Sequence, residues 1–184
     1  IMSGALRQRC HYAPYLSKVC AARDTIPLFK NGQYLGWSGF TPVGDPKVVP
    51  IALAEYVEQH HLQGQMRFNL YIGSFVGEHT EGRWAKDDMI ASRFAYQSSP
   101  DLRKTINEGR CNYHDKHLSM FGPELAWGFY TKGRKYPLDI AIVEATEILE
   151  DGSIVLAGSV GSTPEELQAA EKIIIEINSA IPSF

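Results

Sequence analysis

The chain has 184 residues, of which 44% are apolar and 21% charged, and its 18 basic residues nearly balance 21 acidic ones. This composition is typical of one globular domain, which packing can stabilise without disulfides or a structural metal. The balanced charge argues against nucleic acid as a partner, and the apolar runs are too short for a membrane span. Cys10, Cys20 and Cys111 form no C-x-x-C pair, which indicates reduced thiols.

Hydrophobic periodicity predicts alternating helices and strands along the first part of the chain. We expect a helical stretch at residues 23–30, a strand at Tyr34–Trp37, a helix with Asp45 as N-cap and Pro46 as first residue, a strand at residues 66–72 with one apolar face, a helix from Ser99 to Gly109, and a short strand at residues 111–114.

The last part of the chain predicts the centre and edge of the sheet. The nearly continuous apolar run at residues 138–145 is typical of a strand covered on both faces. Asp151-Gly152 predicts a hairpin turn to an antiparallel strand. Thr163-Pro164-Glu165-Glu166 has capping-box spacing for a helix to Glu171, before a strand at residues 172–178. The predicted fold class is α/β, with a mixed, mainly parallel sheet and helices on both faces.

A glycine-rich segment at residues 31–46 follows one predicted strand and precedes a helix. Gly36, Gly39 and Gly44 let backbone N–H groups approach a bound group closely, and a helix N-terminus favours negative charge. An acyl oxygen or a phosphate would suit this segment, and a tight turn without a ligand is an equally good interpretation. Its spacing matches neither the Walker loop nor G-x-G-x-x-G, which argues against ATP and NAD.

Several motifs along the whole chain point to one family. They are residues 38–47, Tyr96-Gln97-Ser98 with Leu102-Arg103-Lys104, residues 115–119, Glu144-Ala145-Thr146, and residues 150–155, 159–161 and 172–176. Together they resemble the acetyl-CoA hydrolase/transferase family, the acetate-handling branch of class I CoA-transferases, although Ser38 replaces the more usual Gly. Residues 9–16 and 26–32 are most similar to fungal mitochondrial members. The resemblance implies a mitochondrial location, or a cytoplasmic one for a bacterial protein.

The resemblance implies that residues 1–184 form the N-terminal CoA-transferase domain and that the catalytic domain lies C-terminal to them. In this family a glutamate attacks an acyl-CoA thioester, and CoA passes through a glutamyl-CoA intermediate between acetyl-CoA or succinyl-CoA and a small carboxylate. That glutamate would lie C-terminal to this chain, so no catalytic residue is expected here, and Glu144 is assigned to structure. The expected partners are these substrates, the C-terminal domain and a second copy in a homodimer. Coenzyme A is a substrate, and no cofactor is implied.

The resemblance also implies which residues line the acyl pocket, all of them placed after strand ends, where open α/β sheets bind ligands. They are Ser38, Gly39, Phe40, Thr41, Gly73, Phe75, Gln97 and Ser98. Phe75 departs from the small hydroxyl residue that bacterial members tend to have, so a polar contact to substrate would be missing. Ser98 or Ser99 could instead cap a helix.

Three alternatives stay open at this point. Cys111, His114, Asp115 and His117 suggest zinc, but a strand would turn positions 111 and 114 to opposite sides, so we expect no metal. Cys111 could be a nucleophile, although no base is placed beside it. The chain could also be an isolated fragment or docking module without catalysis of its own.

Overall fold

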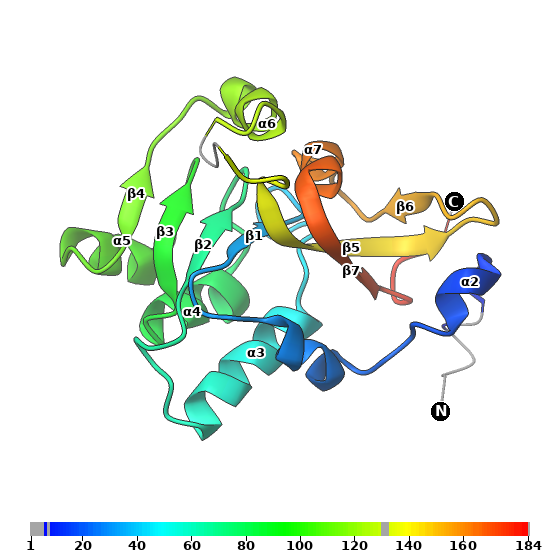
Figure 1. Cartoon of the computed structure of the whole chain (residues 1–184), viewed down its shortest axis with the longest axis horizontal. Helices are drawn as coiled ribbons and strands as arrows, with labels where there is room; N and C mark the ends of the chain where they lie inside the picture. Colours follow the sequence, from blue (N-terminus) through cyan, green and yellow to red (C-terminus); the bar gives the residue numbers. More distant parts are fainter. Residues whose placement is uncertain (1–5, 7, 130–132, 184) are drawn as a thin grey trace.

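The computed structural model describes residue 6, residues 8–129 and residues 133–183. Within these residues a seven-stranded sheet has the order β4-β3-β2-β1-β5-β6, and β7 also pairs with β5 (Figure 1). The strands are β1 (Tyr34–Trp37), β2 (Phe68–Tyr71), β3 (Ile90–Phe94), β4 (Asn112–His114), β5 (Leu138–Ile148), β6 (Ile154–Leu156) and β7 (Ala170–Ile177). Among these strands only β5 and β6 pair antiparallel, so the predicted mixed, mainly parallel sheet is confirmed.

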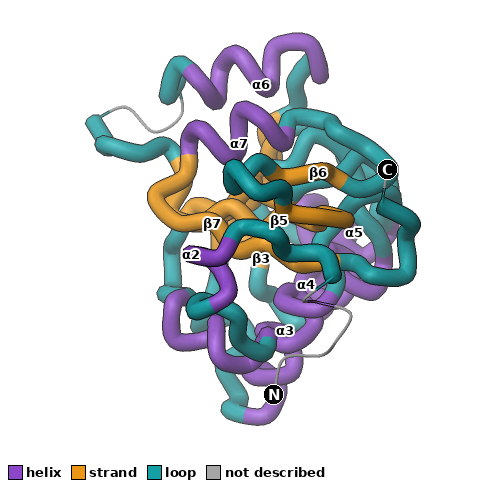
Figure 2. The backbone as a smooth tube through the Cα atoms, turned by 90° about the vertical axis from the view of Figure 1, so that its right-hand side faces the viewer, coloured by secondary structure: helices purple, strands orange, loops and turns teal. Residues whose placement is uncertain are grey.

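Helices cover both faces of this sheet. They are α2 (Ala13–Leu16), the 3-10 helix η1 (Ala22–Leu28), α3 (Val48–Gln59), the π-helical turn η2 (Glu78–Gly82), α4 (Arg83–Lys86), α5 (Pro100–Asn107), α6 (Leu118–Ala126) and α7 (Thr163–Ala169). Figure 2 shows α6 and α7 on one side of the strands and α3 and α4 on the other. None of the described helices has the length and apolar character that a bilayer crossing requires.

The two faces form two separate apolar cores. Leu35, Trp37 and Leu53 belong to the core beneath α3 and α4, whereas Tyr71 and Phe121 belong to the core beneath α6 and α7. Consecutive side chains of a strand point to opposite faces, so a strand between two helical layers must be apolar on both. The apolar face predicted for residues 66–72 is confirmed, because Phe68, Leu70 and Ile72 belong to the core beneath α3 and α4 and Met66 packs against it. The strand itself is shorter than predicted and is limited to Phe68–Tyr71.

The predicted start of the helix after the glycine-rich segment is also wrong. Helix α3 begins at Val48, so Asp45 does not cap it and Pro46 is not its first residue. The free N–H groups of Lys47, Val48 and Val49 instead donate to the carboxylate of Glu176 in β7. This cap comes from a residue far along the chain, and a local sequence pattern therefore cannot reveal it.

The capping box predicted at residues 163–166, at the start of α7, does not form. Thr163 is the first residue of α7 rather than its cap, and its hydroxyl is buried without a partner among the described residues. The helix ends at Ala169, two residues before the expected end, and β7 begins at Ala170. By contrast, Ser99 caps α5 as predicted, because its hydroxyl accepts the backbone N–H of Leu102. Strand β3 and helix α6 had no counterpart in the sequence prediction.

Candidate functional site

The segments that carry the predicted pocket residues meet at one edge of the sheet. Strands β1, β2 and β3 are adjacent and parallel, so the segments that follow them start at the same edge. A Cβ atom built on Gly77, after β2, would lie 3.8 Å from Cβ of Pro42, after β1. A Cβ atom on Gly73 would lie 3.4 Å from Oγ of Ser162, which directly precedes α7. Four segments distant in sequence thus converge at the carboxyl edge of the strands.

Residues 38–45, which we call the glycine loop, fold back on themselves at this edge. Gly39 has φ +105°, and a Cβ atom there would lie 2.8 Å from the backbone nitrogen of Asp45. The backbone N–H of Phe40 donates to Val43 O at 3.1 Å and to Ser159 Oγ at 2.9 Å. Both the backbone conformation and the close approach require glycine at position 39. The loop is therefore held in one tight shape.

Ser38 closes the base of the glycine loop. Its hydroxyl donates to Gly44 O at 2.7 Å and accepts the backbone N–H of Glu144 at 2.9 Å. The side chain is buried, and both hydrogen bonds are made within the fold. Ser38 therefore shapes the loop. Its place in the wall of an acyl pocket stays a prediction, and Ser38 would contribute to that wall through the shape of the loop.

The other predicted pocket residues differ in how much surface they present. Phe40 is 41% exposed, and Thr41 and Ser98 are also exposed. Gly73 is buried, and Phe75 is half-buried. These residues share one edge of the sheet, and their contact with a bound acyl group stays a prediction.

Gln97 differs from this group because its side-chain oxygen is buried. That oxygen has no hydrogen-bond partner among the described residues. A buried amide without a partner is unfavourable, so a bound group that hydrogen-bonds to Gln97 would relieve this cost.

Arg93 joins the segments after β2 and β3, and sequence reasoning missed it. The side chain is completely buried, and its guanidinium donates to the carbonyls of Ile72, Ser74, Phe94 and Tyr96 and to the carboxylate of Glu81. Every N–H group of the guanidinium thus has an acceptor. The one signal in the sequence was a charged residue inside the apolar stretch of β3.

Among the described residues three glutamates are buried, and two of them, Glu81 and Glu144, are paired within the fold. Glu81 pairs with Arg93, and Glu144 accepts hydrogen bonds from Lys47 and Asn178. Glu166 packs over Gly36, where a Cβ atom would lie 3.3 Å from its Cγ. Burial, reinforced by the neighbouring charge of Glu165, raises the pKa of Glu166 well above its usual value. Its raised pKa and its burial both make this carboxyl group a poorer nucleophile than an accessible carboxylate.

In the described residues, the cluster of Cys111, His114, Asp115 and His117 is not arranged as a metal site, and its thiol is not activated. Cys111 is buried, and burial raises the pKa of its thiol to about 11, which disfavours the nucleophilic thiolate. The ring of His114 stacks on Phe94 with centroids 4.3 Å apart. Across the described residues no group of three or more His, Cys, Asp or Glu side chains is arranged to hold a metal ion.

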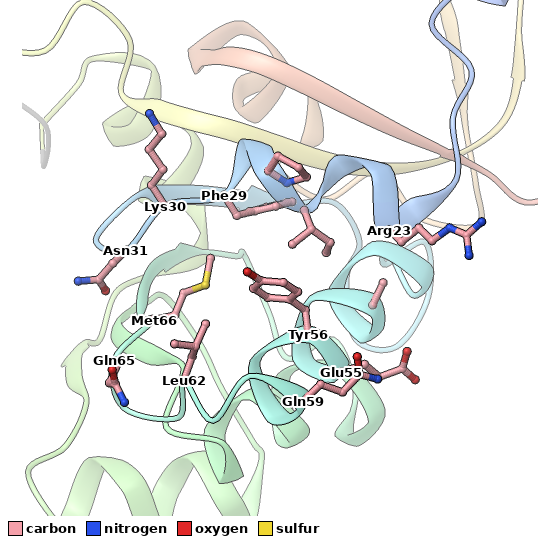
Figure 3. Close-up of a pocket in the computed structure, with 13 residues that line it drawn as sticks. Arg23, Phe29, Lys30, Asn31, Glu55, Tyr56, Gln59, Leu62, Gln65 and Met66 are labelled. Carbon is pink, nitrogen blue, oxygen red and sulfur yellow. The ribbon is translucent and has the colours of Figure 1, made fainter.

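A hollow of about 950 Å³ opens at the opposite edge of the sheet. Its residues come from η1, from α3 and from the segments that precede β1 and β2. Figure 3 shows Phe29, Tyr56 and Met66 around its centre, whereas the charged groups of Arg23 and Lys30 point away from it. The hollow is therefore lined mainly by apolar groups, with the hydroxyl of Tyr56 among them, and is separate from the predicted pocket residues.

Comparison with known proteins identifies the family. A family model described as the acetyl-CoA hydrolase/transferase N-terminal domain matches residues 3–184. The chain belongs to the acetyl-CoA hydrolase/transferase family. Among curated members, the acetyl-CoA hydrolases of Saccharomyces cerevisiae and Neurospora crassa are each 55% identical over 185 aligned residues. The alignments cover the whole chain but 35% of each relative, so the chain spans about a third of their length.

Solved structures share the fold of this family member at low sequence identity. Glutaconate coenzyme A-transferase from Acidaminococcus fermentans matches with a TM-score of 0.59 and 14% identity, over 86% of this chain and 68% of that chain. RipA from Yersinia pestis matches with a TM-score of 0.68 and 13% identity, over 96% of this chain and 38% of that chain. These likenesses confirm the α/β architecture of the acetyl-CoA hydrolase/transferase domain.

Proposed function

We propose that the chain is the acyl-binding N-terminal part of an enzyme that moves CoA between acetyl-CoA or succinyl-CoA and a small carboxylate. The observation that carries this proposal is the glycine loop of a family member, held in one shape at the edge where the segments after three parallel strands meet. Backbone N–H groups at such an edge can stabilise the oxyanion of an acyl-transfer intermediate. Coenzyme A serves as a substrate, and mitochondria are the proposed location.

The proposed reaction is covalent catalysis by a glutamate outside this chain. Its carboxylate oxygen attacks the thioester carbonyl, the CoA thiolate leaves, and an acyl-glutamyl anhydride forms. The thiolate then attacks the glutamyl carbonyl, which releases the first carboxylate and leaves a glutamyl-CoA thioester. An acceptor carboxylate reverses these two steps and leaves as the new acyl-CoA. Glu81, Glu144 and Glu166 are all enclosed, and Glu81 and Glu144 are also paired within the fold, which supports a nucleophile from elsewhere.

Exposed apolar side chains lie beside the glycine loop. They support the proposal that another part of the longer polypeptide packs here and forms the second wall of the site. Phe40, Val43 and Val160 are each more than 40% exposed. Cβ atoms built on Gly158 and Gly161 would lie 2.8 Å from Val43 and 3.8 Å from Phe40, so these side chains share one surface. Neighbouring exposed apolar side chains that form one patch are typical of an interaction site.

CoA exchange between acetyl-CoA and succinate tests the proposed function. We expect none from the 184-residue chain and steady turnover from a polypeptide of the relatives' length that carries it. In the longer polypeptide transfer should exceed hydrolysis, because a bound carboxylate competes with water for the glutamyl-CoA carbonyl. Exchange by the 184-residue chain, or none by the longer polypeptide, would contradict the proposal, and the second result would favour a docking module.

A further inference from the structure

Glu176 joins the start of helix α3 to the last strand of the sheet. It lies in β7, opposite Glu144 in the parallel register of β5 and β7. Its carboxylate accepts the backbone N–H groups of Lys47, Val48 and Val49 at 2.7 Å, 3.0 Å and 2.6 Å. One side chain thus satisfies three of the N–H groups that a helix leaves free at its N-terminus.

This carboxylate stands where a local capping residue would normally be. Lys47 occupies the N-cap position of α3, and no cap from its own side chain is present in this described segment. The helix dipole favours negative charge at this end, so Glu176 supplies both the acceptors and the charge. Only Pro46 and Lys47 separate the glycine loop from α3, and fixing the helix start therefore fixes the end of the loop.

The side chain of Lys47 adds a second attachment at the same place. Its Nζ donates to Asp45 O at 2.7 Å, to Asp45 Oδ1 at 3.1 Å and to Glu144 Oε2 at 2.5 Å. Asn178 Nδ2 donates to Glu144 Oε1 at 2.8 Å. Asp45 and Glu144 are both buried, whereas the side chain of Lys47 is 47% exposed, so the acceptors are held within the fold and the donor reaches them from the surface.

The start of the glycine loop is attached to β5, the strand that carries Glu144. Ser38 bridges the carbonyl of Gly44 and the backbone N–H of Glu144 in β5. The loop is thus held at its start by the hydrogen bond between Ser38 and β5, and at its end by Glu176 in β7. We propose that Glu176 is a positioning residue for the glycine loop and thereby for the acyl group bound there. The catalytic part of this inference rests on the proposed function, whereas the structural part does not.

Substitution Glu176→Gln tests this role in the polypeptide of the relatives' length. The neutral amide removes the charge and turns one acceptor oxygen into a donor group that cannot pair with backbone N–H. Amide hydrogen exchange across residues 39–49 should accelerate at least about tenfold, because local opening of this segment becomes easier. For acetyl-CoA, kcat should fall by about 10- to 100-fold while KM changes less than about twofold, since displacement of a positioning group affects the chemical step.

The matched control is Glu171→Gln, the same chemical change in the same strand. Glu171 is exposed and pairs only with its neighbour Lys172 among the contacts described for it, so neither readout should move. Unchanged amide exchange in residues 39–49 of Glu176→Gln would overturn the positioning role. Faster exchange with unchanged kcat would overturn its catalytic part. If the unsubstituted polypeptide shows no turnover, the proposed function fails, while amide exchange still decides whether Glu176 holds the loop.

Discussion

Arg93→Met is expected to lower the free energy of unfolding by about 3–5 kcal/mol, because breaking a buried ion pair leaves an uncompensated charge. Arg93 and Glu81 are both fully buried, and the substitution also removes the donors for four backbone carbonyls. Urea unfolding of the 184-residue chain, followed by circular dichroism, measures the loss. The segments after β2 and β3 should loosen together, since Arg93 is bonded to both.

The control for Arg93 is Arg110→Met. Arg110 also pairs with carboxylates, Asp88 and Glu108, but its side chain is 38% exposed. Exposed pairs contribute about 0–1 kcal/mol, so the control should lie within that range. Adding Glu81→Leu to Arg93→Met should recover part of the lost stability, because no unpaired charge remains. Equal losses for Arg93→Met and Arg110→Met would contradict the bracing role of Arg93.

Gly39→Ala is expected to reduce turnover of the longer polypeptide by at least about 100-fold, the penalty for misplacing groups at a reaction centre by about 1 Å. An alanine at φ +105° is strained, and its Cβ would lie 2.8 Å from the backbone nitrogen of Asp45. The glycine loop must therefore open to admit the methyl group. Initial rates of CoA exchange at saturating acetyl-CoA measure the effect.

Gly109→Ala is the control for Gly39→Ala, because it introduces backbone strain without a local clash. Gly109 also has positive φ, +73°, but a Cβ atom there meets no atom of the described residues within 4 Å. It follows α5, away from the glycine loop. Its variant should lose some stability and keep turnover within about twofold, since no group at the site moves. Comparable activity losses in the two variants would show that the shape of the glycine loop is not what turnover depends on.

The sequence predicted elements whose causes are local. Strand β1 has the predicted bounds, and Ser99 caps α5 as expected, because apolar runs and capping residues act over a few positions. The start of α3 was mispredicted because its cap is Glu176, which is far away in sequence and adjacent in space. The capping box at Thr163 failed for a different reason, since spacing alone does not show which residue begins a helix.

The sequence predicted where the candidate site lies, but it did not predict the hydrogen bonds that hold the site together. The alternation of strands and helices indicated parallel pairing. Because parallel strands end at the same edge of a sheet, the segments after β1, β2 and β3 share that edge. The hydroxyl of Ser38 was expected at a pocket wall, but it binds the backbone of Gly44 and Glu144. Arg93 could not be assigned because four of its five acceptors are backbone carbonyls, which carry no sequence signal.

A crystal structure of the longer polypeptide with bound acetyl-CoA tests most directly whether the glycine loop forms the wall of the acyl site. The thioester carbonyl should lie against Gly39 and Phe40, with the reacting glutamate contributed by polypeptide outside residues 1–184. An acyl group seated instead in the apolar hollow among Phe29, Tyr56 and Met66, at the other edge of the sheet, would contradict the account.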